Sequence, residues 1–366
     1  MKIECTKEKL QKAVGKAEKI TGKNLTLPIL SCLLLKTEGQ NVIIKSTNLD
    51  LGVELSFGAK VEGEGETAVP ASVLNNYLSS APDTQTVVLS TKEGGLSLSS
   101  KEGSTFIKSH PPEEFPLIPA VPKDSVFRIK ASDIVQGLRA VWYSSSVSSV
   151  KPELASVYIY QSGGSIFFVA TDSFRLAEKQ IINKSKADFA PILIPYKNIS
   201  EIIRVLEDTD EEVEVAVTKN QISFSFPGTY LTSRVIEGVF PDYRQIIPKE
   251  FTTEATLLKQ DLLNTLRLVN IFADKFNQVS FKVSPGKREL EVSSRNSDVG
   301  ESVEKLGGAM RGEDLEIHFN YKYVADCFQS IPSDSVTLRF TGPHKPLLIG
   351  GSGDNSFTYL VMPMNR

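Results

Sequence analysis

The sequence predicts an α+β protein built from three tandem copies of one unit. A strand, a tight turn and a second strand are predicted over Phe168–Ala177, and the same pattern occurs at Lys45–Glu54 and Val292–Glu301. The copies also keep a regular spacing, since Thr171 follows Thr47 by 124 positions. Together these observations indicate a domain duplication.

Other landmarks recur with a period of 125. They open the second helix of each copy and are Pro70, Pro195 and Asn320. A period of this length is too long for a solenoid, because each copy has enough residues to bury its own core. We therefore expect three domains, with the bounds 1–121, 126–247 and 251–366.

Within each copy the predicted order is a strand, a helix and three strands, repeated once. In the first copy, apolar residues at helical spacing predict a helix from Lys7 to about Ile20. The apolar run Leu27–Leu30 is predicted as a strand. Ser72 and Ser132 are predicted to cap helices of the first and second copies.

Composition limits the possible classes. Hydrophobic residues make up 40% of the chain and charged residues 23%, as in an ordinary globular protein. The three cysteines show no close pairing, which favours a reducing interior over a disulfide framework or a zinc site. With no signal-peptide core or membrane-length apolar run, a cytoplasmic protein is expected. The net charge of −3 argues against a generally basic nucleic-acid binder but allows one basic face.

Such a face is predicted on the first helix. Its lysines recur at steps of three or four, and they are Lys9, Lys12, Lys16, Lys19 and Lys23. An isolated run of this kind is usually a solvated face. The alternative is that a polyanion lies against it and relieves the repulsion between like charges.

No catalytic, phosphate-binding or metal-binding motif stands out, and no cofactor is expected. Asp172 beside Arg175 could form a catalytic turn. However, Asp50 and Asp298 lie in the corresponding turns, and acidic side chains in turns commonly bond to the backbone. The structural role is therefore the simpler interpretation.

The turn of the second copy differs from the others by its apolar residues. Phe174 and Leu176 flank Arg175, and the C-terminal segment Tyr359–Met364 is also apolar. Two apolar edges without a catalytic group suggest a groove for a partner's peptide. Two ordinary core strands would explain the same pattern, and the residues alone leave this open.

The chain resembles the DNA polymerase III beta subunits, the bacterial sliding clamps, over essentially its whole length. The matching motifs are Thr26–Leu30, Ala170–Asp172 with Arg175–Ala177, Phe240–Arg244 and Tyr359–Met364. The chain departs from the family's usual pattern at Ser173-Phe174, where Gly-His is common. It departs again at Gln245, where a second arginine is common.

The resemblance implies a DNA clamp fold and a head-to-tail homodimer that forms a ring of six domains around duplex DNA. Helices would line the hole and contact phosphates without reading sequence. The residues expected to face DNA are Lys9, Lys12, Lys16, Lys19, Lys23, Asn24, Lys197, Arg204 and Lys322.

In the family, short apolar peptides from polymerases, the clamp loader and repair proteins bind between the second and third domains. The matching positions here are Leu154, Thr171, Ser173, Phe174, Arg175, Leu176, Pro241, Ile246, Asn320, Tyr323, Val361, Met362, Pro363 and Met364. Candidates for the ring seam are Phe106, Ile107, Ile271 and Phe272, although internal packing would explain these four equally well.

The expected function is therefore that of a non-catalytic processivity factor associated with the DNA polymerase III holoenzyme. Two alternatives remain at this stage. One is a monomeric three-domain peptide adaptor without a DNA role. The other is an enzyme that uses Asp172 and Arg175.

Overall fold

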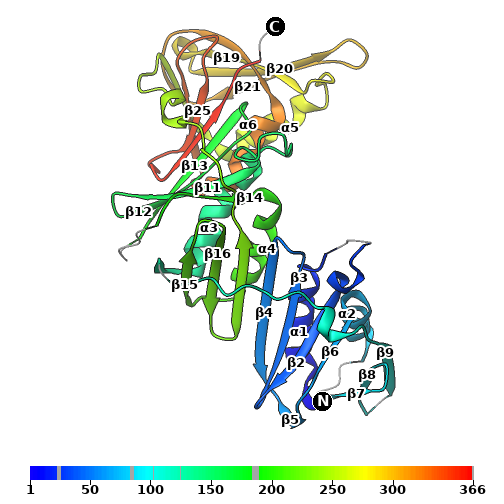
Figure 1. The fold of residues 1–366 in the computed structure, drawn as a ribbon. Helices are drawn as coiled ribbons and strands as arrows, with labels where there is room; N and C mark the ends of the chain where they lie inside the picture. Colours follow the sequence, from blue (N-terminus) through cyan, green and yellow to red (C-terminus); the bar gives the residue numbers. More distant parts are fainter. Residues whose placement is uncertain (23–25, 83–85, 102, 124, 184–188, 365–366) are drawn as a thin grey trace. The chain divides into compact units, whose positions relative to one another are not determined.

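The computed structural model describes residues 1–22, 26–82, 86–101, 103–123, 125–183 and 189–364 (Figure 1). The chain forms two compact units. The first is made mainly of Met1–Ile134 and Lys197–Val235, and the second mainly of Val135–Lys184 and Ile236–Arg366. The predicted middle copy thus contributes part of its chain to each unit.

The first unit contains two antiparallel sheets. The five-stranded sheet has the spatial order β5 (Lys60–Gly63), β1 (Lys2–Thr6), β7 (Thr86–Lys92), β8 (Gly95–Ser99) and β9 (Ser104–Lys108). The eight-stranded sheet has the order β10 (Val126–Lys130), β15 (Glu212–Val217), β16 (Gln221–Phe226), β17 (Thr229–Arg234), β4 (Leu51–Gly58), β3 (Asn41–Thr47), β2 (Cys32–Glu38) and β6 (Glu66–Pro70).

The second unit has the same plan. Its nine-stranded sheet has the order β14 (Ile192–Pro195), β11 (Ser156–Ser162), β12 (Ser165–Thr171), β13 (Arg175–Ile182), β26 (Phe357–Val361), β25 (Leu347–Gly351), β24 (Ser335–Phe340), β18 (Thr253–Leu258) and β22 (Ala309–Gly312). Its four-stranded sheet has the order β21 (Gly300–Gly307), β20 (Glu289–Asn296), β19 (Gln278–Ser284) and β23 (Leu315–Asn320).

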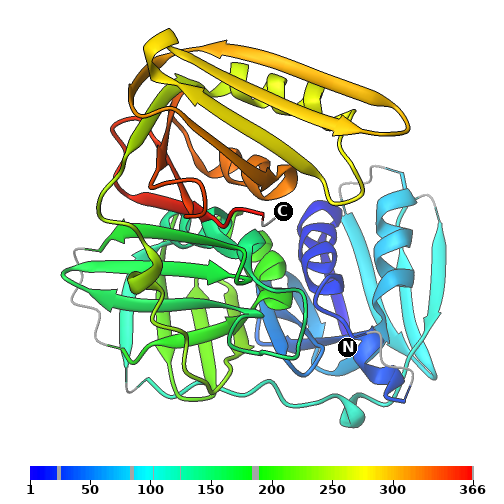
Figure 2. The ribbon, with the colours of Figure 1, turned by 90° about the horizontal axis from the view of Figure 1, so that it is seen from above.

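Helices follow the first strand of each half-copy. The α-helices are α1 (Lys7–Glu18), α2 (Ala71–Ser80), α3 (Ala131–Val141), α4 (Tyr196–Leu206), α5 (Lys259–Asn270) and α6 (Tyr321–Ala325). Short 3-10 helices are η1 (Pro28–Ser31), η2 (Pro112–Glu114), η3 (Trp142–Ser144), η4 (Tyr243–Ile246), η5 (Pro285–Lys287) and η6 (Asp326–Ser330). In the first unit α1 lies beside α2 (Figure 2), with Leu10, Val14 and Ala17 buried. None of the described helices is long and apolar enough to cross a membrane.

Sheets continue from one copy into the next. The last strand of the second copy, β17, pairs with β4 of the first, and the last strand of the third copy, β26, pairs with β13 of the second. In both cases the partner is the strand that follows the recurring turn. Adjacent copies are therefore joined by backbone hydrogen bonds as well as by side-chain packing.

Two local predictions were wrong. Leu27–Leu30 is not a strand, because Pro28 begins the 3-10 helix η1, in which Ile29 and Leu30 are buried. A short apolar run cannot separate these possibilities, and proline disfavours a sheet ladder.

The predicted serine caps were also wrong. Ser72 and Ser132 are each the second residue of their helices rather than the cap. In the first copy, Pro70 still pairs with Cys32 in the sheet, and the helix starts at the next residue, Ala71. No loop residue is left to serve as a side-chain cap.

Candidate nucleic-acid interface and peptide-binding pocket

The recurring turn of the second copy lies between β12 and β13, as the sequence predicted. The hydroxyl of Thr171 donates to the carbonyl oxygen of Arg175 at 2.6 Å. Asp172 Oδ1 accepts the backbone N–H groups of Phe174 and Arg175, each at 3.0 Å. Ser173 adopts a positive φ of 78°. Asp172 therefore holds the turn together, which supports the structural interpretation of this acidic residue.

Arg175 is anchored on three sides. Its Nε donates to Asp172 Oδ2 at 3.0 Å, its Nη1 to Asp326 Oδ2 at 2.5 Å and its Nη2 to the carbonyl oxygen of Tyr143 at 2.6 Å. Its side chain is only 12% exposed. Burial alone would lower the pKa of the guanidinium, but Tyr359 and the two carboxylates raise it above its usual value. Arg175 thus remains charged and ties the turn to the third copy.

An exposed aromatic surface lies beside this anchor. The ring of Phe174 stacks against Tyr323 with centroids 6.1 Å apart, and Phe174 remains 59% exposed. Arg175 also faces the Tyr323 ring, at 4.8 Å from its centroid. The C-terminal segment joins this region, since Met362 N donates to the carbonyl oxygen of Phe174 at 2.8 Å.

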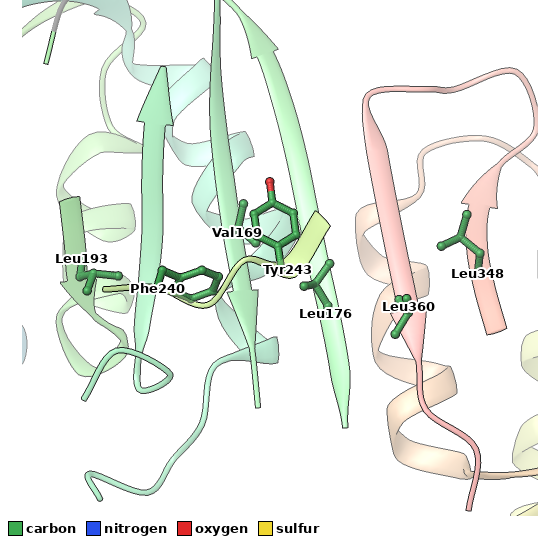
Figure 3. Packing of buried hydrophobic residues seen from close by; sticks show 7 residues of the cluster. All are labelled: Val169, Leu176, Leu193, Phe240, Tyr243, Leu348 and Leu360. Atoms are coloured by element: carbon green, nitrogen blue, oxygen red, sulfur yellow. The ribbon is translucent and has the colours of Figure 1, made fainter. Parts of the chain in front are cut away.

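An apolar row crosses the junction between β13, β26 and β25. Leu176 lies opposite Leu360, which lies opposite Leu348, and all three are buried (Figure 3). Tyr243, from the segment after β17, packs into the same cluster. The residue of this segment that was predicted for the pocket is its neighbour Val361.

Val361, the residue predicted for the pocket, and Leu360 lie on different faces of β26. Successive side chains of a strand point to opposite faces, so Val361 lies on the face away from Leu176 and Leu360. Both tail residues are apolar, and only the pairing register separates them. No signal in the sequence sets that register.

The remaining pocket candidates all belong to the second unit. Leu154 and Thr171 are buried, whereas Pro241 and Ile246 are exposed. Asn320 caps α6 by accepting from Lys322 N, and Met364 N donates to the carbonyl oxygen of His318. Ser173, Met362, Pro363 and Met364 line the turn and tail with side chains that are at least partly accessible.

The lysines predicted to face DNA from α1 and its C-cap lie on one side of the helix, away from its buried apolar residues, whereas Lys7 is itself buried. Lys9, Lys12 and Lys19 are exposed. Lys16 is mostly buried, with a side chain 14% exposed, and its Nζ lies 2.9 Å from a carboxylate oxygen of Asp208. The predictions for Lys23 and Asn24 fall outside the described residues.

The other basic candidates lie on later helices. Lys197, at the start of α4, pairs with Asp50, and Arg204 on the same helix pairs with Glu201 at 2.9 Å. Lys322 is exposed on α6 of the second unit. Several expected phosphate contacts thus already have an acidic partner within the chain.

The four seam candidates differ in burial. Phe106 is 49% exposed and Ile271 is 68% exposed, while Phe272 is half-buried. Ile107 is buried opposite Leu96 and packs internally within the isolated chain. No seam candidate was predicted on strand β21, which lies at an edge of the four-stranded sheet.

The fold and these surfaces define a multi-domain binding protein made of repeated α+β units. Three domain families match consecutive parts of the chain. They are the N-terminal, central and C-terminal domains of the DNA polymerase III beta subunit, at residues 1–119, 128–242 and 244–365.

Relatives and solved structures agree with these matches. The beta sliding clamp of Caulobacter vibrioides is 29% identical, with 100% of both chains covered. The DNA polymerase III beta subunit of Thermotoga maritima has a TM-score of 0.94 at 26% identity, covering 100% of this chain and 99% of that one. A Bartonella birtlesii sliding clamp bound to griselimycin has a TM-score of 0.94 at 26% identity, with 100% of both chains covered.

The chain belongs to the DNA polymerase III beta subunit family, the bacterial sliding clamps. Its function is that of a DNA sliding clamp, and the relatives are processivity factors rather than enzymes. These matches give no support to the alternative of a monomeric peptide adaptor.

Proposed function

We propose that two copies of this chain close head to tail into a ring that encircles duplex DNA and carries polymerase and other proteins along it. The observation that carries this proposal is the pattern of strand edges. At each internal junction, the last strand of one copy pairs with the strand that follows the turn of the preceding copy. Among the described strands, two strands of this type have a neighbour on one side only. They are β9, the last strand of the first copy, and β21, the strand after the turn of the third copy.

One such edge at each end of the chain supports a head-to-tail contact with a second molecule. A heterologous contact of this type forms a closed ring if the rotation closes. Ring closure would also pair two strand edges that are otherwise open to aggregation. The same backbone pairing would then be used at all six domain junctions.

The internal junctions predict the register of the seam. Thr232 lies opposite Gly52 where β17 meets β4. In β9, Phe106 lies opposite Ser97, and in β17, Thr232 lies opposite Ser223. Phe106 is therefore the residue of the first copy that corresponds to Thr232 of the second.

In β21, Glu301 lies opposite Arg295, and in β4, Gly52 lies opposite Thr47. Glu301 is therefore the residue of the third copy that corresponds to Gly52 of the first. Phe106 should therefore lie opposite Glu301 of the second copy, and Ser104 opposite Val303. This register places the exposed side chains of Phe106, Val299 and Val303 together. Ile271 and Phe272 would lie at the same seam.

The DNA contacts would come from helices. The exposed lysines of α1 support a basic lining, to which Lys197, Arg204 and Lys322 would contribute. Phosphate contacts carry no sequence information, which suits a ring that must move along DNA.

Peptides of partner proteins would bind at the aromatic and apolar surface of the second unit. Phe174, Tyr323, Ile246 and Met362 offer partly exposed apolar side chains. Leu176, Leu360 and Arg175 would support this surface from beneath. We further propose association with the DNA polymerase III holoenzyme, a cytoplasmic location, and the domain bounds 1–121, 126–247 and 251–366.

The ring can be tested by sealing its seam. The variant Ser104→Cys with Val303→Cys should form a covalent dimer on oxidation, because the two positions are predicted to lie directly opposite each other. The three native cysteines are buried and should not compete. Rings that are loaded on nicked circular DNA and then sealed by oxidation should stay bound at salt concentrations that remove ordinary phosphate contacts, and should leave when the circle is cut.

The matched control pairs Ser104→Cys with Glu301→Cys, which lie diagonally across the predicted seam. At about 7–8 Å, their Cα atoms are too far apart for efficient disulfide formation. Equal cross-linking of the two variants would reject this register. Equal loss from circular and linear DNA would reject encirclement.

A further inference from the structure

The most buried lysine of the basic stripe on α1 is held by a carboxylate from the turn after α4. Asp208 follows α4 and reaches Lys16 Nζ at 2.9 Å and Lys12 Nζ at 3.7 Å. Both lysines lie on the side of α1 that carries the exposed cations, one turn apart. One carboxylate therefore bridges two neighbouring cations of this face.

The three side chains differ in their exposure to solvent. The Lys16 side chain is 14% exposed, whereas the side chains of Lys12 and Asp208 are 62% and 41% exposed. The hydrogen bond from Lys16, together with the charges of both lysines, lowers the pKa of Asp208. The carboxylate is thus ionised at neutral pH, and it remains open to solvent on one side.

We propose that Asp208 occupies a phosphate-binding site, and that a DNA backbone phosphate displaces it from Lys12 and Lys16 when the helix meets DNA. A carboxylate and a phosphate both present anionic oxygens to ammonium groups. The inference rests on the proposed function, since it takes α1 as a DNA-facing helix. It adds that this face carries its own counter-ion, which competes with DNA.

The energies allow such an exchange. The Lys12–Asp208 pair is exposed and contributes about 0–1 kcal/mol, so it is the weaker of the two pairs, while Lys16 is mostly buried and lies closer to the carboxylate. Each lysine freed for phosphate would contribute to counterion release and to affinity. By competing for them, Asp208 would keep the hold on any one phosphate weak, which favours movement along the duplex.

A second pair in the first unit shows the same feature. Lys197, at the start of α4, pairs with Asp50, whose other oxygen lies 4.0 Å from Arg234. Lys197 is 59% exposed and Asp50 34%. The carboxylate again comes from a different part of the chain than the cation, as at Asp208.

The test compares Asp208→Asn with Asp210→Asn in the full-length protein. Asp210 is exposed, lies two residues further along the same segment, and forms no ion pair with the described residues. Both variants lose one negative charge, so long-range effects on DNA binding are matched. Binding to a short fluorescent linear duplex is measured by anisotropy at several salt concentrations.

Asp208→Asn should bind the duplex about fivefold more tightly at low salt, which corresponds to about 1 kcal/mol, the limit for an exposed pair such as that with Lys12. Its plot of log affinity against log salt should be steeper by about one to two, as one or two lysines become available. Asp210→Asn should keep the slope of the parent protein. In a background carrying Lys12→Gln and Lys16→Gln, Asp208→Asn should have no effect beyond that of Asp210→Asn.

Equal changes of DNA affinity in Asp208→Asn and Asp210→Asn would overturn the proposal. It would also be overturned if Asp208→Asn, folded with the melting temperature of the parent protein, kept the parent's slope of log affinity against log salt. Retention on circular DNA is measured in parallel. If the parent protein is retained on circular DNA and the two variants behave alike, only the role proposed for Asp208 is rejected. Failure of the parent protein to be retained on circles would instead reject encirclement.

Discussion

The recurring turns of the first and second copies use the same backbone structure for different purposes. In the first copy, Asn48 Oδ1 accepts the backbone N–H groups of Asp50 and Leu51 at 3.0 and 2.8 Å, just as Asp172 Oδ1 accepts two N–H groups in the second. Leu49 has a φ of 74°, close to the 78° of Ser173.

The threonine at the start of each turn also acts in the same way. Thr47 donates to the carbonyl oxygen of Leu51, and Thr171 donates to that of Arg175. Each hydroxyl also accepts an N–H group from the residue with positive φ. The repeat has thus kept the hydrogen bonds that build the turn, made by a threonine in both copies and by Asn48 in one and Asp172 in the other.

The last two residues of each turn have different roles in the two copies. The first copy has Asp50, which pairs with Lys197, followed by buried Leu51. The second has Phe174, an exposed ring, followed by Arg175, an internal anchor. Function can therefore change at these positions without disturbing the turn.

The largest expected effect comes from Arg175→Ala. The substitution leaves Asp326, Asp172 and the Tyr143 carbonyl without their cation, and breaking such a buried pair costs about 3–5 kcal/mol. The urea midpoint for unfolding of the second unit should fall accordingly. Arg234→Ala, near the first turn, is the control and should cost under about 1 kcal/mol, because Arg234 is 64% exposed and 4.0 Å from Asp50. Similar losses in both variants would show that Arg175 is not an anchor.

A smaller effect is expected from exchanging Asp50 and Phe174 between the turns. Phe174→Asp should weaken binding of a short apolar peptide from the polymerase about tenfold, because an exposed aromatic contact is lost. Its unfolding midpoint should hardly change, since the backbone bonds of the turn remain. The reciprocal variant Asp50→Phe should gain no peptide binding. Isothermal titration calorimetry measures both, and unchanged affinity in Phe174→Asp would exclude this ring from the pocket.

The smallest expected effect tests the shared part of the turns. Thr47→Val and Thr171→Val preserve shape but remove the hydroxyl, and both threonines are buried. Each variant should lose about 1 kcal/mol of unfolding free energy, as expected for one hydrogen bond. Denaturant titration should give equal losses within about 0.5 kcal/mol. A clear difference would mean that the two turns are not equivalent.

Much of the fold could be predicted from the sequence because the signals were local. The turn residues around Asn48 and Asp172, the alternating strands beside them and the helical spacing of Leu10, Val14 and Ala17 were recognised correctly. The error at Leu27–Leu30 arose where an apolar run was too short to distinguish a strand from a helical turn.

The candidate sites were harder to predict because they depend on partners far away in the chain. Arg175 was placed among the peptide contacts, and the structure uses it as an anchor for Asp326, which is 151 residues away. Lys16 was placed on the DNA face, and it is held by Asp208. Charge and spacing identify such residues, but they do not show whether another side chain already neutralises them.

By itself the sequence determined the threefold repeat, the class of fold and the turn in each copy, because these follow from hydrophobic periodicity and side-chain bonds within a few residues. Only the tertiary structure decided which edge strands remain unpaired, whether Leu360 or Val361 faces Leu176, and which cations are already paired. Those features depend on strand register and on contacts between distant segments, where shifting the pairing by one residue reverses the face that each side chain meets.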